Sequence, residues 1–246
     1  MTQRTIRRRC VAFLAIGAMA ALAMPNTAQA APQLADLDAK QSMSVKASNG
    51  ESLEGKDLRP IQLATYTAAS VDDNTIVGYD LTTNTALASD ITAAAKAAGA
   101  TDTNLTVNGK NDPMVWVVKN LTDSRSDPWS GKLRNFCNSL AKQTNFAKQD
   151  GTAVSTLSQD KATMSTGNVL VPGIYAIVDR TPATTTLSSG TAIKTTASIM
   201  MMNGTAVNGI SQLRTASGTT LTLGQVIYKV SSVETPDKKV NVGSTW

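Results

Sequence analysis

Histidine does not occur among the 246 residues of this chain. Its absence excludes Ser-His-Asp and Cys-His catalysis and most zinc sites. Cysteine is nearly as scarce, with only Cys10 and Cys137, and aromatic residues make up 4% of the chain. We therefore expect a protein that is not an enzyme, has no catalytic residues and needs neither a metal nor a cofactor.

The first thirty residues have the three-part pattern of a secretory signal peptide. An arginine cluster ending at Arg9 precedes an apolar run from Val11 to Met24, and small residues follow at Ala28 and Ala30. The apolar run is shorter than the roughly 20 residues that span a bilayer. The pattern predicts that residues 1–30 are removed and that the mature chain is secreted, with no membrane span. The alternative is a retained membrane anchor.

Removal of the signal changes the charge of the chain. The whole sequence has 23 basic and 18 acidic residues, a net charge of +5. Four arginines leave with residues 1–30, so the mature chain has 19 basic and 18 acidic residues and a net charge of +1. A charge this small gives no support for binding nucleic acid or a membrane surface. Cys10 also leaves, and Cys137 alone forms no internal disulfide.

Most of the mature chain is predicted to be β-structure. Residues 31–41 are expected to be a flexible leader, residues 42–232 a β-domain, and residues 233–246 a linker and the truncated start of a second domain. Asn-Gly pairs, typical of hairpin turns, recur at Asn49, Asn108, Asn203 and Asn208. The candidate strands are Ile61–Thr67, Thr75–Tyr79, Met114–Lys119, Gly173–Asp179, Thr196–Met202 and Thr220–Val230.

Two short helices are predicted within this β-pattern. Leu87–Ala98 has Ser89 or Asp90 as a candidate N-cap and a glycine after its end. Gly131–Phe146 has apolar residues at helical spacing, with Cys137 among them, which indicates a packed core thiol.

One enzyme motif can be found. Ser139 and Lys142 match S-x-x-K, the serine-nucleophile motif of penicillin-recognising enzymes. The companion motifs are lacking, because Lys194-Thr195-Thr196 has no glycine for K-T-G and no S-D-N occurs. A solvated helix face is the alternative, and the one we favour.

The stretch "VPGIYAIVD" at Val171–Asp179 is the most informative segment. In a strand, Tyr175, Ile177 and Asp179 would share one face, and both faces are apolar. Asp179 then either lies at the margin of a core as a buried acid or simply ends the strand and begins the following turn. We favour the second reading on the residues alone.

Three segments together resemble the N-terminal domain of sortase-assembled fimbrial subunits of Gram-positive, especially actinobacterial, bacteria. They are "SMSVKASNGESLEGKDLRPIQLATYT", "VLVPGIYAIVDRTP" and "VSSVETPDKKV". The second is similar to the PGxY strand of collagen-adhesin B-type immunoglobulin-like domains. The resemblance implies an immunoglobulin-like β-sandwich with one or two short helical insertions.

The resemblance also implies a set of site residues. In many such domains a lysine attacks an asparagine side chain, promoted by a buried acid, and forms an intramolecular isopeptide bond. Asp179 matches the acid and Lys46 is the candidate lysine of the first strand, although Lys46 falls on the opposite face from Met43 and Val45. Lys238 or Lys239 would be the reactive lysine of the next domain, and Lys229 is the candidate for the lysine that sortase joins to another subunit.

The expected function is that of a structural subunit or tip component of a cell-surface fimbria that contributes to adhesion. Its partners would be other pilin subunits, sortase, and a host glycan or matrix protein. One alternative is a stand-alone secreted module that binds glycan or matrix protein, and another is a serine acyl-transferase using Ser139 and Lys142.

Overall fold

The longest strand, β3 (Leu58–Asp72), organises the main sheet. It pairs antiparallel with β9 (Gly173–Asp179) on one side and with β4 (Thr75–Thr83) on the other. The turn between β3 and β4 is tight because Asp73 and Asn74 both have positive φ, 43° and 56°. Six strands follow the order β12-β9-β3-β4-β13-β14, and a seventh, β1 (Gln33–Leu34), pairs with β3 outside this order. The remaining strands are β12 (Met201–Gly204), β13 (Gln212–Arg214) and β14 (Thr220–Thr222).

The computed structural model describes residues 32–48, 51–107, 109–121, 131–195, 200–215, 218–228 and 232–234. These residues all fall within one compact unit, residues 31–246. Its strands outnumber its helices, so the expected mainly β class is confirmed.

A second sheet has the order β15-β2-β8-β7, in which β15 and β2 run parallel. Its strands are β15 (Gln225–Tyr228), β2 (Ser44–Ala47), β8 (Thr163–Ser165) and β7 (Thr156–Leu157). A third, smaller sheet and one hairpin complete the described strands: β10 (Thr184–Thr186), β11 (Ala192–Thr195) and β16 (Ser232–Glu234), then β5 (Thr106–Val107) and β6 (Lys110–Asn111).

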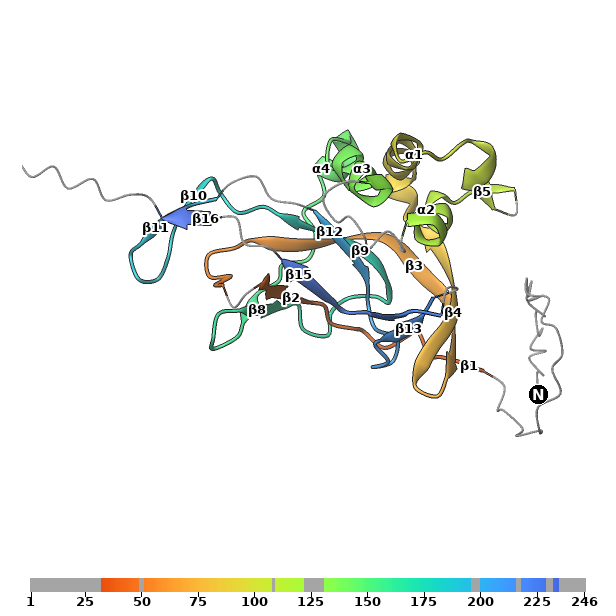
Figure 1. Ribbon diagram of the computed structural model, residues 1–246, viewed down its shortest axis with the longest axis horizontal. Helices are drawn as coiled ribbons and strands as arrows, with labels where there is room; N and C mark the ends of the chain where they lie inside the picture. Colours follow the sequence, from red (N-terminus) through yellow and green to blue (C-terminus); the bar gives the residue numbers. More distant parts are fainter. Residues whose placement is uncertain are drawn as a thin grey trace, which may run out of the picture. The chain divides into compact units, whose positions relative to one another are not determined.

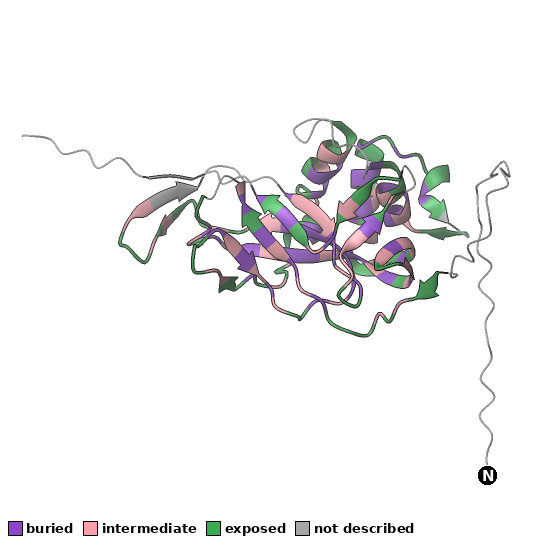
Figure 2. Cartoon of the chain, turned by 60° about the horizontal axis from the view of Figure 1, so that its bottom comes forward, coloured by how far each residue is buried: buried purple, intermediate pink, exposed green. Residues whose placement is uncertain are grey.

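The helices gather on one face of the main sheet and the second sheet lies on the other (Figure 1). They are η2 (Thr85–Leu87), α1 (Ala88–Ala97), η3 (Thr103–Leu105), α2 (Pro113–Leu121), α3 (Gly131–Leu140) and α4 (Thr144–Ala147). Two hydrophobic cores result. The helix-side core includes Leu63, Ile91 and Phe136, and the sheet-side core includes Val45 and Val226. Buried residues follow the central strands between these layers (Figure 2).

The predicted strand Met114–Lys119 is wrong, because these residues belong to helix α2. Pro113 occupies the first turn, where its missing N–H costs nothing. The hydroxyl of Thr83 accepts a hydrogen bond from the backbone N–H of Met114 at 3.0 Å. Met114, Val117 and Leu121 then share one buried face at helical spacing. A continuous apolar run is compatible with a strand or a helix, and here Pro113 and the Thr83 hydrogen bond at the N-terminus favour the helix.

The first predicted helix is confirmed as α1, whereas the second is broken into α3 and α4. Neither Ser89 nor Asp90 caps α1, whose N-cap residue is Leu87. Asp90 is buried and instead accepts hydrogen bonds from the backbone N–H of Phe146 at 2.7 Å and from Nδ2 of Asn145 at 3.1 Å. The acid therefore stabilises the N-terminus of α4 from a neighbouring helix.

The Asn-Gly pairs have different structures. Asn208 and Gly209, with φ of 47° and 78°, form the expected turn between Val207 and Ile210. The pair at Asn203 lies inside β12, so the turn predicted there is wrong. Its glycine serves close packing, since a Cβ on Gly204 would overlap the hydroxyl of Tyr66.

The expected flexible leader is hydrogen-bonded to the rest of the domain. Strand β1 (Gln33–Leu34) pairs antiparallel with the far end of β3, and Gln41 forms a bridge with Leu170. The long candidate strand Thr220–Val230 is also divided, into β14 and β15, at Gly224 with φ of 75°.

Candidate functional site

Strand β9 is the predicted strand "GIYAIVD", and its first residue is placed by close packing. Gly173 begins the strand beside β3, where the pairing shifts register between Gln62 and Ala64. A Cβ on Gly173 would overlap the carbonyl of Ala64. The glycine of the "PG" pair is therefore required by the approach of two backbones rather than by a positive φ.

The two faces of β9 contribute to different cores, as the alternation predicted. Ile174 and Ala176 lie in the helix-side core, whereas Tyr175 and Ile177 lie in the sheet-side core. Asp179 is the next residue on the latter face. Its side chain is only 2% exposed, so the carboxyl group lies at the margin of the core between the two sheets.

Asp179 has two roles that the sequence presented as alternatives. Its Oδ1 accepts a hydrogen bond from the backbone N–H of Thr181 at 2.8 Å, which begins the turn after β9. Its Oδ2 accepts a hydrogen bond from the hydroxyl of Tyr228 at 2.5 Å. The acid therefore ends its strand and at the same time joins the main sheet to β15 of the second sheet.

A buried lysine faces the same carboxylate. The Nζ atom of Lys56 lies 3.8 Å from Oδ2 of Asp179, and the lysine side chain is 0% exposed. Lys56 follows Gly55, whose φ of 76° turns the chain just before β3, and its ammonium lies 5.8 Å from the ring centroid of Tyr228. Burial lowers the pKa of Lys56, and the charge of Asp179 partly offsets this shift.

Lys56, Asp179 and Tyr228 form what we call the buried ion-pair cluster. It brings together a turn, the end of β9 and the end of β15, which are far apart in the sequence. Chemically, the cluster can hold an ion pair in a dry environment. A lysine amine with a lowered pKa beside a carboxyl is also the pair of groups from which an amide bond could form.

The structure does not bring Lys46 to Asp179. Lys46 lies on β2 with its side chain exposed, opposite in direction to the buried Val45 and Ala47. Its charge acts on Asp160, where it contributes to lowering the pKa of that carboxyl after larger contributions from hydrogen bonds. The candidates Lys229, Lys238 and Lys239 lie outside the described residues.

Sequence reasoning missed both partners of Asp179. Lys56 lies between Gly55 and Asp57, a polar context that is typical of an exposed turn. A stronger signal existed for Tyr228, because alternation along Gln225–Tyr228 places Val226 and Tyr228 on the same buried face. The pairing of β15 with β2, which brings Tyr228 near Asp179, could not be read from the residues.

The other candidates lie elsewhere in the fold. Cys137 is buried in the helix-side core, and burial raises the pKa of its thiol to about 11, consistent with the expected packed thiol. Ser139 lies in the last turn of α3, which ends at Leu140, and Lys142 is an exposed residue beyond that end. The backbone N–H of Lys142 donates to the carbonyl of Ser139 at 3.1 Å, so the S-x-x-K pair closes one turn after α3, with the lysine side chain in solvent.

Comparison with protein-family models, characterised proteins and solved structures finds no significant match to this chain. Among the described helices, none is long and apolar enough to cross a bilayer.

Proposed function

We propose that the chain is a structural subunit or tip component of a secreted cell-surface fimbria, with a non-catalytic role in adhesion. The observation that supports this proposal best is the buried ion-pair cluster. Its acid lies at the end of the PGxY strand, where the fimbrial domains that the sequence resembles keep their bond-forming acid. Here the acid joins β9 to β15 and holds Lys56.

The arrangement suits a subunit that must resist unfolding outside the cell. The mature chain has no second cysteine, so it has no internal disulfide to restrain its strands. The cluster ties three distant segments together at the margin of the sheet-side core. A polar cross-link of this kind is specific, since it is satisfied only when both sheets are in their native register.

We further propose an immunoglobulin-like β-sandwich as the arrangement of the two larger sheets. In support, they share the sheet-side core, and the helices pack on the outer face of the main sheet as insertions between strands. The fimbrial partners would be other pilin subunits, joined by a sortase through a lysine such as Lys229.

The experiment that tests this function is detection of the protein on the bacterium that produces it. Antibodies raised against the purified chain are used for immunogold electron microscopy and for blots of boiled cell-wall extracts. We expect labelled fibres and a ladder of covalent polymers, and the ladder should be lost when Lys229 is replaced by alanine. Detection of monomer alone in the culture medium would contradict the proposal and favour the stand-alone binding module.

A further inference from the structure

Strands β2 and β15 are parallel neighbours, although they come from near opposite ends of the described chain. Their register pairs Gln225 with Ser44 and Tyr228 with Ala47, so the two strands are in step over their whole length. Figure 1 shows them side by side in the second sheet. Along the chain, every strand of the main sheet except β1 lies between them.

The parallel direction decides how a pull on the two ends of the chain reaches this pair. The chain enters β2 at Ser44 and leaves β15 at Tyr228, at the opposite end of the pair. A pull on both chain ends therefore slides the two strands past each other along their length. Sliding loads the evenly spaced hydrogen bonds of a parallel pair all at once, whereas peeling two strands apart from one end breaks such bonds one after another.

Both strands are also fixed to the rest of the fold. β2 pairs antiparallel with β8 on its other side. At the start of β15, Nδ2 of Asn203 donates to the carbonyl of Gln225 at 2.6 Å, which joins this strand to β12 of the main sheet. At the end of β15, the hydroxyl of Tyr228 donates to Asp179 at 2.5 Å. These two bonds must break as well before β15 can slide.

We propose that β2 and β15 form a mechanical clamp, which resists unfolding when the chain is stretched between its two ends. β1 and β16 lie outside the clamp along the chain, so their two and three paired residues can detach while the strands between β2 and β15 stay folded. Separation of β2 from β15 is then the step that sets the resistance of the domain to force.

This inference rests on the proposed fimbrial role for its biological purpose, because a subunit joined to neighbours at both ends carries the tension of the fibre. The two proposals fail separately. An absence of fibres on the bacterium would overturn the fimbrial role, whereas the clamp is measured on the purified chain.

The test is single-molecule force spectroscopy of the mature chain, with handles attached in two arrangements. In the first, the handles are fused to Ala31 and Trp246, so the pull slides the clamp. In the second, they are bonded to Lys40→Cys and Thr222→Cys in a Cys137→Ala background. Lys40 and Thr222 are exposed and precede β2 and β15, so this pull acts at the same end of both strands. The first arrangement should need at least about twice the unfolding force, because its barrier is the whole clamp.

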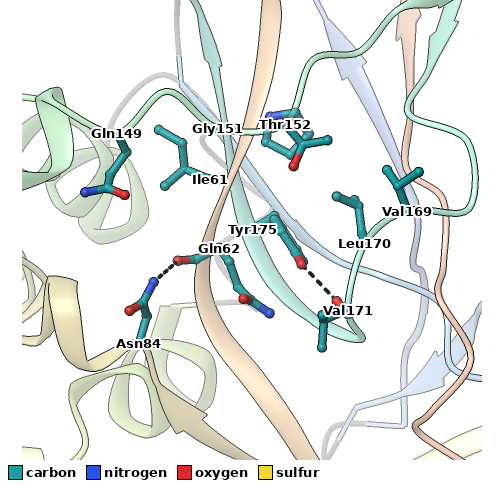
Figure 3. A pocket seen from close by; sticks show the side chains of 11 residues that line it. Ile61, Gln62, Asn84, Gln149, Gly151, Thr152, Val169, Leu170, Val171 and Tyr175 are labelled. Atoms are coloured by element: carbon teal, nitrogen blue, oxygen red, sulfur yellow. Dashed lines mark hydrogen bonds between the residues drawn. The ribbon is translucent and has the colours of Figure 1, made fainter.

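The matched variants are Tyr228→Phe and Tyr175→Phe, each of which removes one hydroxyl and its hydrogen bond from the sheet-side core. The bond from Tyr175 runs to the nearby carbonyl of Val171 and does not cross the clamp (Figure 3). At constant force between the chain ends, Tyr228→Phe should unfold roughly tenfold faster or more, since a hydrogen bond to a charged group is lost. Tyr175→Phe should unfold at the rate of the unchanged chain.

Two results would overturn the inference. They are equal unfolding forces in the two arrangements, and equal unfolding rates for the two tyrosine variants. The comparison of the arrangements needs neither tyrosine variant, so it decides the question even if Tyr228→Phe fails to fold.

Discussion

Replacement of Asp179 by alanine tests the buried ion-pair cluster most directly. The variant removes the carboxylate that faces Nζ of Lys56 at 3.8 Å and that accepts hydrogen bonds from Tyr228 and Thr181. The lysine side chain is 0% exposed and cannot reach water without local rearrangement. Removing one partner of a buried ion pair costs about 3–5 kcal/mol of the free energy of unfolding.

For a domain of this size each kcal/mol lowers the melting temperature by about 2–4 °C, so we expect a fall of roughly 6–20 °C. The matched control is Asp57→Ala. Asp57 pairs with Arg59 at the surface, where the two side chains are 37% and 32% exposed, and such pairs contribute at most about 1 kcal/mol. Both variants are measured by urea denaturation followed by circular dichroism.

A double-mutant cycle with Lys56→Met separates the ion pair from general packing damage. Methionine removes the cation while it keeps most of the side-chain volume, and Asp179 retains its two hydrogen bonds. The combined variant should therefore be more stable than the sum of the single effects predicts, by about 2 kcal/mol or more. The reasoning is refuted if Asp179→Ala costs less than about 1 kcal/mol, or if the two effects are additive.

Three further predictions concern pH, packing and covalent structure. Between pH 9 and 11 the free energy of unfolding should fall, because burial raises the pKa of Cys137 from 9.0 to about 11 and the unfolded state therefore loses its proton first. Cys137→Ala should reduce that fall by about 2 kcal/mol in denaturation curves measured across this range. Gly173→Ala should lower the free energy of unfolding by at least about 2–3 kcal/mol, because its Cβ would overlap the carbonyl of Ala64. The control is Gly78→Ala on β4, where a Cβ meets nothing within 4 Å and the stability should stay near that of the unchanged chain. Similar melting temperatures for the two variants would contradict the packing argument. Intact-mass spectrometry should give the unmodified mass of the mature chain, because a charged ammonium and a carboxylate held as an ion pair do not condense. A deficit of one water molecule that disappears in Lys56→Met would show instead that Lys56 and Asp179 form an amide bond.

The sequence predicted the parts of the fold that depend on local patterning. The alternation along Gly173–Asp179 and the helix predicted at Leu87–Ala98 from its flanking signals each correspond to an observed element. It failed for Met114–Lys119, where the apolar run is continuous and the helix start is set by Pro113 together with the contact of Met114 with the distant Thr83. It failed also for Asn203-Gly204, because the need for glycine there comes from Tyr66 on another strand.

Of the two charged residues of the candidate site, one could be predicted from the sequence and the other could not. Asp179 could be found because its own strand is strongly patterned and because it interrupts an apolar run. Lys56 could not be found in this way, because its burial depends on the end of β15 covering it, a long-range contact with Tyr228 that no local pattern encodes. A charged residue in a polar turn is usually solvated, so nothing in its local sequence marks Lys56 as buried.

The physics of the cluster also explains why the missed lysine matters more than the predicted one. Lys46, exposed on β2, remains near water, and its interactions are screened. Lys56 is removed from water, and Asp179 opposite it favours its charged form. The lowered pKa of the lysine records how incompletely this pair offsets desolvation. The same exclusion of water strengthens the hydrogen bond from Tyr228 to the shared carboxylate.

Loosening of β15 would admit water, solvate Lys56 and weaken both interactions together, so the end of β9 and the end of β15 should open as one cooperative unit. Hydrogen exchange of the backbone amides of Thr181 and Tyr228 should then show equal protection, lost together in Asp179→Ala, whereas unequal protection would mean that the two sheets open independently.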